Sequence, residues 1–299
     1  MKRIFLLLSL ATGIIATVNA QNFDNVQMKH TKIKDSIYLM QGAGGNIGLL
    51  IGPEGVFMID DQYRELGEKI EKAVAKITNR PIKYVFNTHW HFDHAGSNEA
   101  FGKKAQIIAH ENVRKRLQED HTITPFGWDV KAMKASGWPV ITFDEGFKMY
   151  LNNEEIQMIH GPAAHTDGDA FVYFKKANII HAGDTFVRYG FPFIDAYSGG
   201  SIDGMIDVLG KIIAMADENT IIIPGHGALA KEADVAEVRD MLIATRKIIV
   251  DAKKAGRSKE ELMKSDILAD YEKRWSGNFI NTERFIQLVY EGFDNHMNE

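Results

Sequence analysis

The chain has 299 residues, of which 45% are hydrophobic and 25% are charged, and its formal net charge is −5. This composition is typical of a folded globular protein and argues against intrinsic disorder. A negatively charged chain lacks the positive field that a polyanion needs, so we expect no nucleic-acid partner. The sequence contains no cysteine, which excludes disulfides, thiolate nucleophiles and cysteine-ligated zinc.

Residues 1–20 have the pattern of a secretory signal peptide. Two basic residues precede an apolar stretch over 4–18, and small residues lead up to Ala20. The stretch is short for a membrane span and contains polar residues, and no later segment reaches about 18 consecutive apolar residues. We therefore expect cleavage after Ala20, an exported periplasmic protein and no stable membrane anchor.

The first half of the chain is predicted to form a sheet with helices beside it. Residues 21–36 are polar and are expected to form a loose lead-in. Three apolar runs follow over 36–40, 46–51 and 55–60, and the glycine-rich turns between them indicate an antiparallel meander. Hydrophobic periodicity then predicts a helix over 63–78, strands over 82–87 and 105–109, and a helix over 111–118.

The second half repeats the order of strands followed by a helix. We expect residues 120–139 to be irregular but packed. The elements predicted after them are strands over 146–151, 155–160, 170–174 and 178–181, a helix over 201–216, a strand over 220–223, and helices over 233–255, 259–264 and 282–293. No low-complexity linker divides the chain, so we expect a catalytic domain over 21–230 with a helical extension over 231–299 packed on it.

Four potential metal ligands follow the strand predicted over 82–87. They are His89, His91, Asp93 and His94, and imidazole and carboxylate groups are common ligands of zinc. Side chains two residues apart share one side of an extended segment, so His89 and His91 are placed to bind one ion. A turn after them would aim Asp93 and His94 at a second ion. A histidine-rich surface turn is the alternative, but three histidines and an aspartate at this spacing favour metal binding.

Two ions need more ligands than this cluster provides. His165 lies in a loop between two predicted strands, and Asp184 follows the end of another strand. His226 follows the strand predicted over 220–223. Strand ends of this kind meet at one rim of an α/β fold, so we expect these three side chains to approach the cluster.

The sequence His-x-His-x-Asp-His, a later loop histidine, a Gly-Asp and a Gly-His together resemble the metallo-β-lactamase superfamily over about residues 36–230. The resemblance implies an α/β fold, a four-layer αβ/βα sandwich with the metal site along one edge of the two sheets, here with a helical C-terminal extension. It implies metal positions bound by His89, His91 and His165 and by Asp93, His94 and His226, with Asp184 bridging them. It also implies that Asp60 orients the ligand loop.

Two departures from family patterns bear on the substrate. Zinc β-lactamases usually have Cys or a small polar residue where this chain has Asp184. An Asp there is typical of glyoxalase II-like thioesterases, lactonases, RNA-processing members and sulfur dioxygenases. The lactonase pattern also has a Tyr where this chain has Val187, so Tyr189 or Tyr197 would have to replace it.

The resemblance implies a zinc-dependent hydrolase acting on a small-molecule substrate, which is an ester, lactone, thioester or amide, with β-lactams among the candidates. Two Zn²⁺ ions would hold a bridging hydroxide, and Asp93 would be the catalytic residue that orients it and passes a proton to the leaving group. Iron and manganese are alternatives to zinc, because these ligands suit all three metals. Two rival functions stay open: a mononuclear-iron oxidoreductase of the sulfur dioxygenase type, and a non-catalytic periplasmic metal-binding protein. The oligomeric state is also open, with a homodimer as one arrangement.

The remaining histidines and aromatic residues have simpler interpretations. We expect His110 to begin a helix, His160 and His181 to have structural roles, and the last three to be exposed, namely His30, His121 and His296. The aromatic residues after Asp184 either wall an apolar pocket or pack the connection, and they are Phe186, Tyr189, Phe191, Phe193 and Tyr197. The C-terminal aromatic residues are expected in the core or in a dimer contact, and they are Tyr271, Trp275, Phe279, Phe285 and Tyr290.

Overall fold

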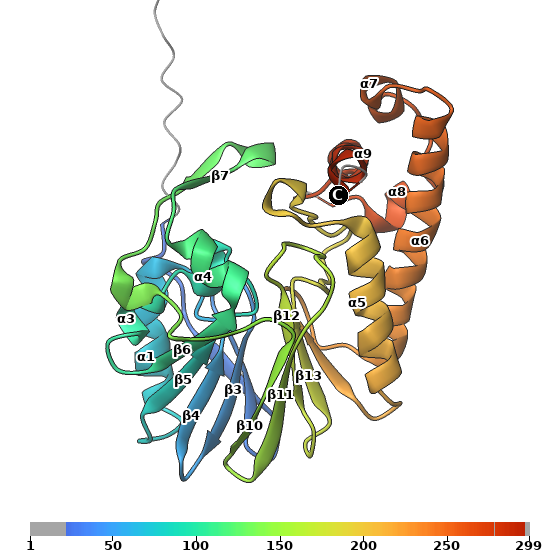
Figure 1. Cartoon of the computed structure of the whole chain (residues 1–299). Helices are drawn as coiled ribbons and strands as arrows, with labels where there is room; N and C mark the ends of the chain where they lie inside the picture. Colours follow the sequence, from blue (N-terminus) through green and yellow to red (C-terminus); the bar gives the residue numbers. More distant parts are fainter. Residues whose placement is uncertain (1–21, 278, 297–299) are drawn as a thin grey trace, which may run out of the picture.

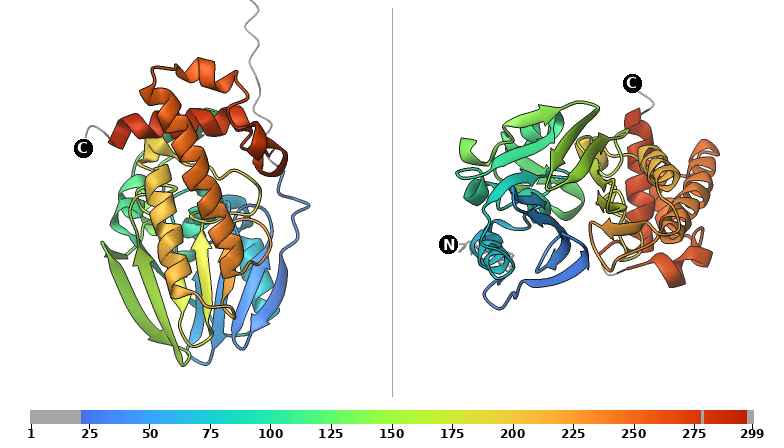
Figure 2. Two further views of the ribbon diagram at one scale, coloured as in Figure 1. Left: turned by 90° about the vertical axis from the view of Figure 1, so that its right-hand side faces the viewer. Right: turned by 90° about the horizontal axis from the view of Figure 1, so that it is seen from below.

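Two β-sheets lie face to face, with helices on the outer side of each (Figures 1 and 2). The structure is a computed structural model that describes residues 22–277 and 279–296, so the predicted signal peptide lies outside the described residues. The first sheet has the strand order β1-β2-β3-β4-β5-β6-β9, and the second has the order β10-β11-β12-β13-β14. The layered sandwich and the helical C-terminal extension predicted from the sequence are confirmed.

The elements fall into three groups along the chain. The first group is β1 (Lys29–Lys34), β2 (Ile37–Gln41), β3 (Ile47–Gly52), β4 (Gly55–Ile59), α1 (Gly67–Ala75), β5 (Ile82–Phe86), α2 (Phe92–Ala95), α3 (Asn98–Phe101), β6 (Gln106–His110), α4 (Glu111–Leu117), β7 (His121–Ile123), β8 (Trp128–Val130) and β9 (Ile141–Phe143). The second is β10 (Gly146–Leu151), β11 (Glu154–His160), β12 (Ala170–Phe174), β13 (Ile179–Gly183), α5 (Ile202–Met215) and β14 (Ile221–Pro224). The extension contains α6 (Glu232–Lys254), α7 (Lys259–Met263), α8 (Ala269–Trp275) and α9 (Thr282–His296).

Strand direction sets where the site forms. Strands β2, β3 and β4 pair antiparallel, which confirms the predicted meander. Strands β4, β5, β6 and β9 then pair parallel, and so do β13 and β14 in the second sheet. The carboxyl ends of β4, β5, β13 and β14 reach the same edge of the sandwich, where the loops that follow them can meet.

The central strands are buried on both faces because they contribute to two cores at once. In β4, Phe57 and Ile59 pack between the sheets, whereas Val56 and Met58 pack toward α1. Side chains alternate across a strand, so a continuous apolar run supplies both layers. Strand β12 does the same for the space between the sheets and the core beneath α5, α6 and α9.

Several predicted elements differ from those in the structure. Residues 29–34 form the edge strand β1 instead of a loose lead-in; its side chains are almost all exposed, so it lacks the apolar alternation that marks a strand. The helix expected over 63–78 is shorter, because residues 64–66 form a 3₁₀ turn before α1. Residues 120–139 contain the β7–β8 hairpin and are not wholly irregular. The short elements α2, α3, β9 and α8 had no prediction of their own.

The C-terminal helices pack on the outer side of the second sheet. Helix α9 crosses the upper end of α5 and α6 in Figure 2, and Phe285 of α9 stacks on Phe191 with ring centroids 4.2 Å apart. Phe285 and Leu288 share one core cluster with Phe171 of β12. None of the helices within residues 22–277 and 279–296 is long and apolar enough to cross a membrane.

Replacing Phe285 by Ala should destabilise the whole protein, because the side chain is fully buried in the core that the extension shares with the second sheet. We expect the free energy of unfolding in urea to fall by about 3–5 kcal/mol. Tyr150→Ala is the control, since Tyr150 is 71% exposed and its loss should change stability by no more than about 0.5 kcal/mol. An unchanged main transition in Phe285→Ala would mean that the extension folds independently.

Candidate metal centre

All seven predicted ligands converge at the shared edge of the two sheets. Their ligand atoms fall into three overlapping groups in which all atoms lie within 4.8 Å of one another. These groups are His89, His91 and His165; His89, His94 and Asp184; and Asp93, His94 and His226. The loops after β5, β11, β13 and β14 thus bring one set of nitrogen and oxygen ligands together from positions up to 137 residues apart.

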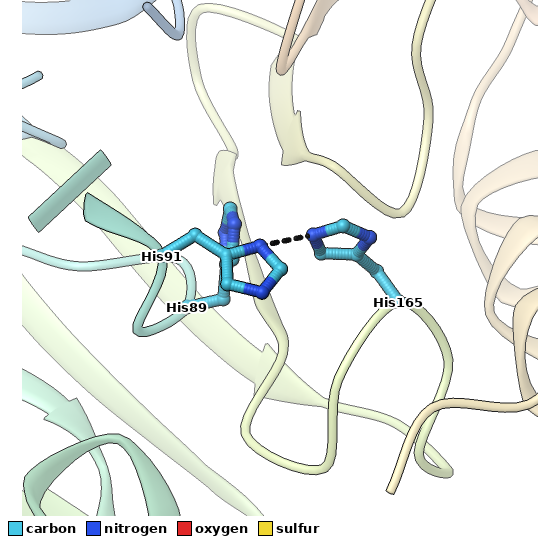
Figure 3. A group of neighbouring side chains, drawn as sticks. All are labelled: His89, His91 and His165. Carbon is cyan, nitrogen blue, oxygen red and sulfur yellow. Dashed lines mark hydrogen bonds between the residues drawn. The ribbon is translucent and has the colours of Figure 1, made fainter. Parts of the chain in front are cut away.

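The first group contains three imidazole rings whose nitrogens face one another (Figure 3). His165 Nε2 lies 2.8 Å from His91 Nδ1. The opposite nitrogen of each ring has a partner that can only accept: His91 Nε2 donates to the Asp195 carboxylate at 3.0 Å, and His165 Nδ1 donates to the Phe193 carbonyl oxygen at 2.8 Å. In the neutral rings both facing nitrogens therefore carry lone pairs, which repel each other unless a cation lies beside them.

A buried carboxylate, Asp60, fixes the ring of His94 directly and the ring of His89 through Thr88. It accepts from Thr88 N and from the Thr88 hydroxyl, both at 2.8 Å, and from His94 Nδ1 at 2.7 Å. The Thr88 hydroxyl, having donated its proton to Asp60, accepts from His89 Nδ1 at 3.0 Å. His89 and His94 therefore both present the lone pair of Nε2 to the site, and buried His89 Nε2 has no hydrogen-bond partner.

Asp184 lies between the two outer groups. We call these the first group (His89, His91 and His165) and the second group (Asp93, His94 and His226). Asp184 Oδ1 is 3.1 Å from His94 Nε2, and Asp184 Oδ2 is 3.5 Å from His226 Nε2 and 3.8 Å from His165 Nε2. On the other side, Asp93 Oδ2 lies 3.2 Å from His226 Nε2. This geometry allows one carboxylate to contact ions in both groups. The orphaned His89 nitrogen and the facing lone pairs show that the residues present fit bound cations.

Electrostatics differ between the two groups. Burial, reinforced by the neighbouring histidines, lowers the pKa of His89, and burial with His91 lowers the pKa of His165 to about 4. Burial opposes a charge on His94 as well, but Asp184 and Asp93 outweigh it and raise its pKa. Asp184 likewise outweighs burial at His226 and raises its pKa. The first group is thus ready to bind metal when neutral, whereas the second holds protons more tightly.

Glycine residues let the backbone approach this site closely. A Cβ on Gly45 would overlap the His94 ring, and one on Gly225 would overlap Asp184 Oδ1. The two segments also pair directly, because Asn46 N donates to Gly225 O at 2.7 Å. The glycine-rich turn after β2 therefore borders the ligands.

A cavity of about 400 Å³ opens above the ligands, and we call it the metal cavity. Four of the seven ligands line it, together with residues of both halves and of the extension: Gly44, Tyr63, His91, Phe92, Asp93, Ile123, Trp128, Asp184, Tyr189, Phe193, His226 and Phe279. None of these described lining residues is Lys or Arg. A few charged and polar groups inside an apolar wall are typical of a small-molecule site.

The aromatic residues after Asp184 were predicted either to wall a pocket or to pack the connection, and the structure shows both. Tyr189 and Phe193 line the metal cavity, whereas Phe186 and Phe191 are buried in the core. Tyr197 is directed elsewhere and donates to Glu291 at 2.8 Å, so only Tyr189 of the two tyrosines reaches the cavity. Phe279 does not lie in the core, because it is 37% exposed and lines the metal cavity, whereas its predicted place in a dimer contact stays a prediction.

His30 is exposed, as predicted, whereas four further histidines have structural surroundings. His181 is buried and its Nε2 donates to Asn46 O at 3.0 Å, and His160 Nδ1 donates to Asp169 O at 2.6 Å. His110 ends β6 and caps the N-terminus of α4, as expected for a residue that begins a helix. His121 is partly buried, not exposed: its Nε2 donates to Arg116 O at 2.9 Å and its ring packs on Trp90.

Two aspartates that support the ligands had no prediction. Asp195 anchors His91, and that hydrogen bond holds the Asp195 pKa below its usual range although burial opposes it. Asp169 accepts from His165 N, Thr166 N and the Thr166 hydroxyl, which shapes the His165 loop. Asp195 lies 104 residues from His91, so no local motif connects them. The one sequence signal for Asp169 is its place in the short loop that carries His165.

Substituting these supporting carboxylates should weaken the two groups separately. Asp60→Asn removes the charge that accepts from His94, and Asp195→Asn removes the charge that accepts from His91. Because Asp60 bonds His94 directly and reaches His89 only through Thr88, we expect Asp60→Asn to lower affinity more at the second group than at the first. We expect Asp195→Asn to lower it at the first, with losses of roughly 10- to 100-fold in each case. Competition with a chromogenic chelator measures the metal affinity of each group in turn, as two binding steps. Each variant is the control for the other. Equal losses at both steps in both variants would contradict this assignment.

Acid should empty the two groups at different pH values. A proton on an imidazole competes with a metal ion. The raised pKa of His94 and His226 means that their group takes up protons at a higher pH than His89 and His165, whose pKa values are lowered. As the pH falls from about 8 to about 5, we expect metal content to drop in two steps, with the second group emptied first. Loss of both ions in one step, measured by elemental analysis after dialysis, would contradict this expectation.

Comparisons with known proteins agree with this geometry. A sequence profile of the metallo-beta-lactamase superfamily matches residues 41–226. A hydroxyacylglutathione hydrolase from Pelagibacter ubique is 27% identical over 179 residues, which cover 57% of this chain and 65% of that protein, so the chain spans less than two thirds of this relative. A metallo-beta-lactamase from Chryseobacterium indologenes is 21% identical over 226 residues, which cover 71% of this chain and 89% of that protein.

Solved structures show the same fold. A metallo-beta-lactamase from Pontibacter korlensis superposes with a TM-score of 0.58 at 17% identity, over 72% of this chain and 99% of that chain. The sequence profile covers more than half of the chain, including all seven residues that converge at the sheet edge. The protein belongs to the metallo-beta-lactamase superfamily.

Proposed function

We propose that this protein is an exported zinc-dependent hydrolase that cleaves a small ester, lactone, thioester or amide. The observation that carries the proposal is the set of lone pairs fixed toward one another on the floor of the metal cavity, with Asp184 between the two groups. His89, His91 and His165 would hold one zinc ion, Asp93, His94 and His226 would hold the other, and Asp184 would contact both. When bound, the ions supply Lewis acidity, which lowers the pKa of water and polarises a carbonyl oxygen.

Asp93 is suited to move the proton in this reaction. Burial opposes its ionisation, but His94 and His226 outweigh it and lower the pKa to about 2, so the group is a carboxylate at neutral pH. Its side chain lines the metal cavity and is not fully enclosed. From this position Asp93 can orient an attacking water, accept its proton and return a proton to the leaving group.

The relatives support a hydrolytic reaction. Hydroxyacylglutathione hydrolase and metallo-beta-lactamase are the names of proteins similar to this chain, and the proposal extends a reaction of that class to it. Export is supported by the signal-peptide pattern of residues 1–20. The aromatic walls of the metal cavity and the lack of Lys and Arg among its lining residues favour a substrate that is uncharged near the bond to be cleaved.

Metal content and hydrolysis measured together test the proposal. Protein starting at Gln21 and purified without added metal should contain about two zinc ions per chain. It should hydrolyse at least one member of a panel of esters, lactones, thioesters and β-lactams. A strong chelator should abolish the activity and zinc should restore it, because the ions supply the Lewis acid. One iron ion per chain with oxygen uptake would refute the hydrolase, and bound metal with no turnover would favour a binding protein.

Replacing Asp93 by Asn should reduce kcat by roughly 100- to 10,000-fold, because the amide keeps the shape of the side chain but cannot accept the proton. Asp240→Asn is the matched control, since the Asp240 side chain is 71% exposed on α6. Elemental analysis of both variants should still find metal bound to the protein, because the His89, His91 and His165 group is intact in each. A kcat for Asp93→Asn within tenfold of the wild-type value, at about equal metal content, would exclude this role.

A further inference from the structure

A second cavity lies next to the metal cavity. It has a volume of about 330 Å³, and we call it the side cavity; its aromatic and aliphatic lining residues are Phe23, Tyr63, Phe92, Trp128, Val130 and Met133. Tyr63, Phe92 and Trp128 line both cavities, so the two hollows lie side by side along one aromatic wall. The volume of each is within the range of ordinary ligand pockets.

The shared wall is built from rings that pack on one another. The Tyr63 and Phe92 rings are 5.6 Å apart, and Phe92 meets Trp128 edge-on at 5.8 Å. Phe23 continues the row, with its ring 4.8 Å from Tyr63. Contacts of this kind hold the rings in fixed orientations and leave an apolar face toward the cavities.

Trp128 is in contact with other rings and is still partly exposed. It lies on the β7–β8 hairpin, at the same end of the sandwich as α9 in Figure 1. One face stacks on Phe126 at 4.4 Å, and Phe279 of the extension lies 6.2 Å away. Trp128 nevertheless stays 40% exposed. A large aromatic residue held in place but left open beside a cavity is typical of a ligand-binding wall.

The charges around the side cavity leave no net attraction for an ionic group. Two cations and two anions, Arg64, Lys131, Glu65 and Asp129, lie among its lining residues. Both cations are already paired, Arg64 with Glu99 at 2.6 Å and Lys131 with Asp120 at 2.7 Å. An anionic substrate group would have to compete with these carboxylates. An uncharged apolar group would bury aromatic surface without breaking either pair.

We propose that the side cavity is a second substrate subsite, which binds an uncharged apolar arm of the molecule whose bond is cleaved at the metal centre. The inference rests on the proposed hydrolase function and names its substrate class: an ester or related acyl compound with an aryl or alkyl arm on one side of the bond. Because Tyr63, Phe92 and Trp128 line both cavities, an arm in the side cavity would lie along the same aromatic wall as the group held at the metal centre.

Three esters that differ only in the arm test the preference. Ethyl acetate has no arm, ethyl 4-phenylbutanoate carries it on the acyl side, and 4-phenylbutyl acetate carries it on the alcohol side. For the zinc-loaded protein we expect kcat/KM of one arm-bearing ester to exceed that of ethyl acetate by at least about tenfold, because the arm buries apolar surface. Val130→Trp, which fills the side cavity, should remove most of this advantage and leave ethyl acetate within about twofold.

Binding to the metal-free protein provides a reading that does not depend on catalysis. We expect 4-phenylbutan-1-ol to bind in calorimetric titrations and Val130→Trp to weaken it by about tenfold. Val140→Trp is the matched control: Val140 is 61% exposed and lies outside the lining of both cavities, so its replacement should change neither binding nor kinetics. Trp128→Ala removes the shared wall and should weaken binding too, which keeps the test valid if thermal melting shows that Val130→Trp does not fold.

The outcomes separate the subsite from the hydrolase function. Ester hydrolysis without an arm preference, together with no binding of the alcohol, would overturn the subsite and keep the hydrolase. Binding of the alcohol that Val130→Trp weakens, with no hydrolysis of these esters or of any member of the wider panel of lactones, thioesters and β-lactams, would support the subsite and refute the hydrolase. A shift to a smaller oligomer in Val130→Trp, seen by sedimentation with unchanged alcohol binding, would assign the side cavity to a second copy of the chain and overturn the proposal.

Discussion

The placement of protons on the buried imidazole rings is the constraint on which the site depends. Asp60, Asp195 and the Phe193 carbonyl oxygen each accept from a ring nitrogen, directly or through Thr88, and so turn the opposite nitrogens inward as lone pairs. Two nitrogens 2.8 Å apart that both carry lone pairs in a buried space repel each other. The network that holds them must therefore be rigid, and a cation between the rings relieves the repulsion that the fold imposes.

The two sheets supply this rigidity. Asp60 directly follows β4 and has a positive φ of 61°, and its carboxylate connects that strand end to the loop after β5. Val56 and Met58 pack toward α1, while Phe57 and Ile59 pack between the sheets, so β4 cannot slide without disturbing two cores. The second sheet contributes Asp184 and His226 from the adjacent parallel strands β13 and β14. Neither sheet alone holds a complete set of ligands.

The ligands could be predicted because chemistry and local sequence agree at each of them. His89, His91, Asp93 and His94 form one short motif, and the other three follow apolar runs that end at the same rim. Asp195 and Phe279 could not be identified in this way. Asp195 acts on a ring 104 residues away, and Phe279 lines the metal cavity only because the extension folds back over it. Strand β1 was not predicted, because its side chains are almost all exposed. Apolar and polar residues do not alternate along it, so its sequence is like that of a loop.

The central claim is that these seven residues bind two zinc ions, and anomalous X-ray diffraction from crystals grown without added metal tests it most directly. Data collected on both sides of the zinc absorption edge identify each ion by element and position. The account predicts two zinc peaks, one beside His89, His91 and His165 and one beside Asp93, His94 and His226, with Asp184 contacting both. A single peak, or an iron signal in place of zinc, would contradict it.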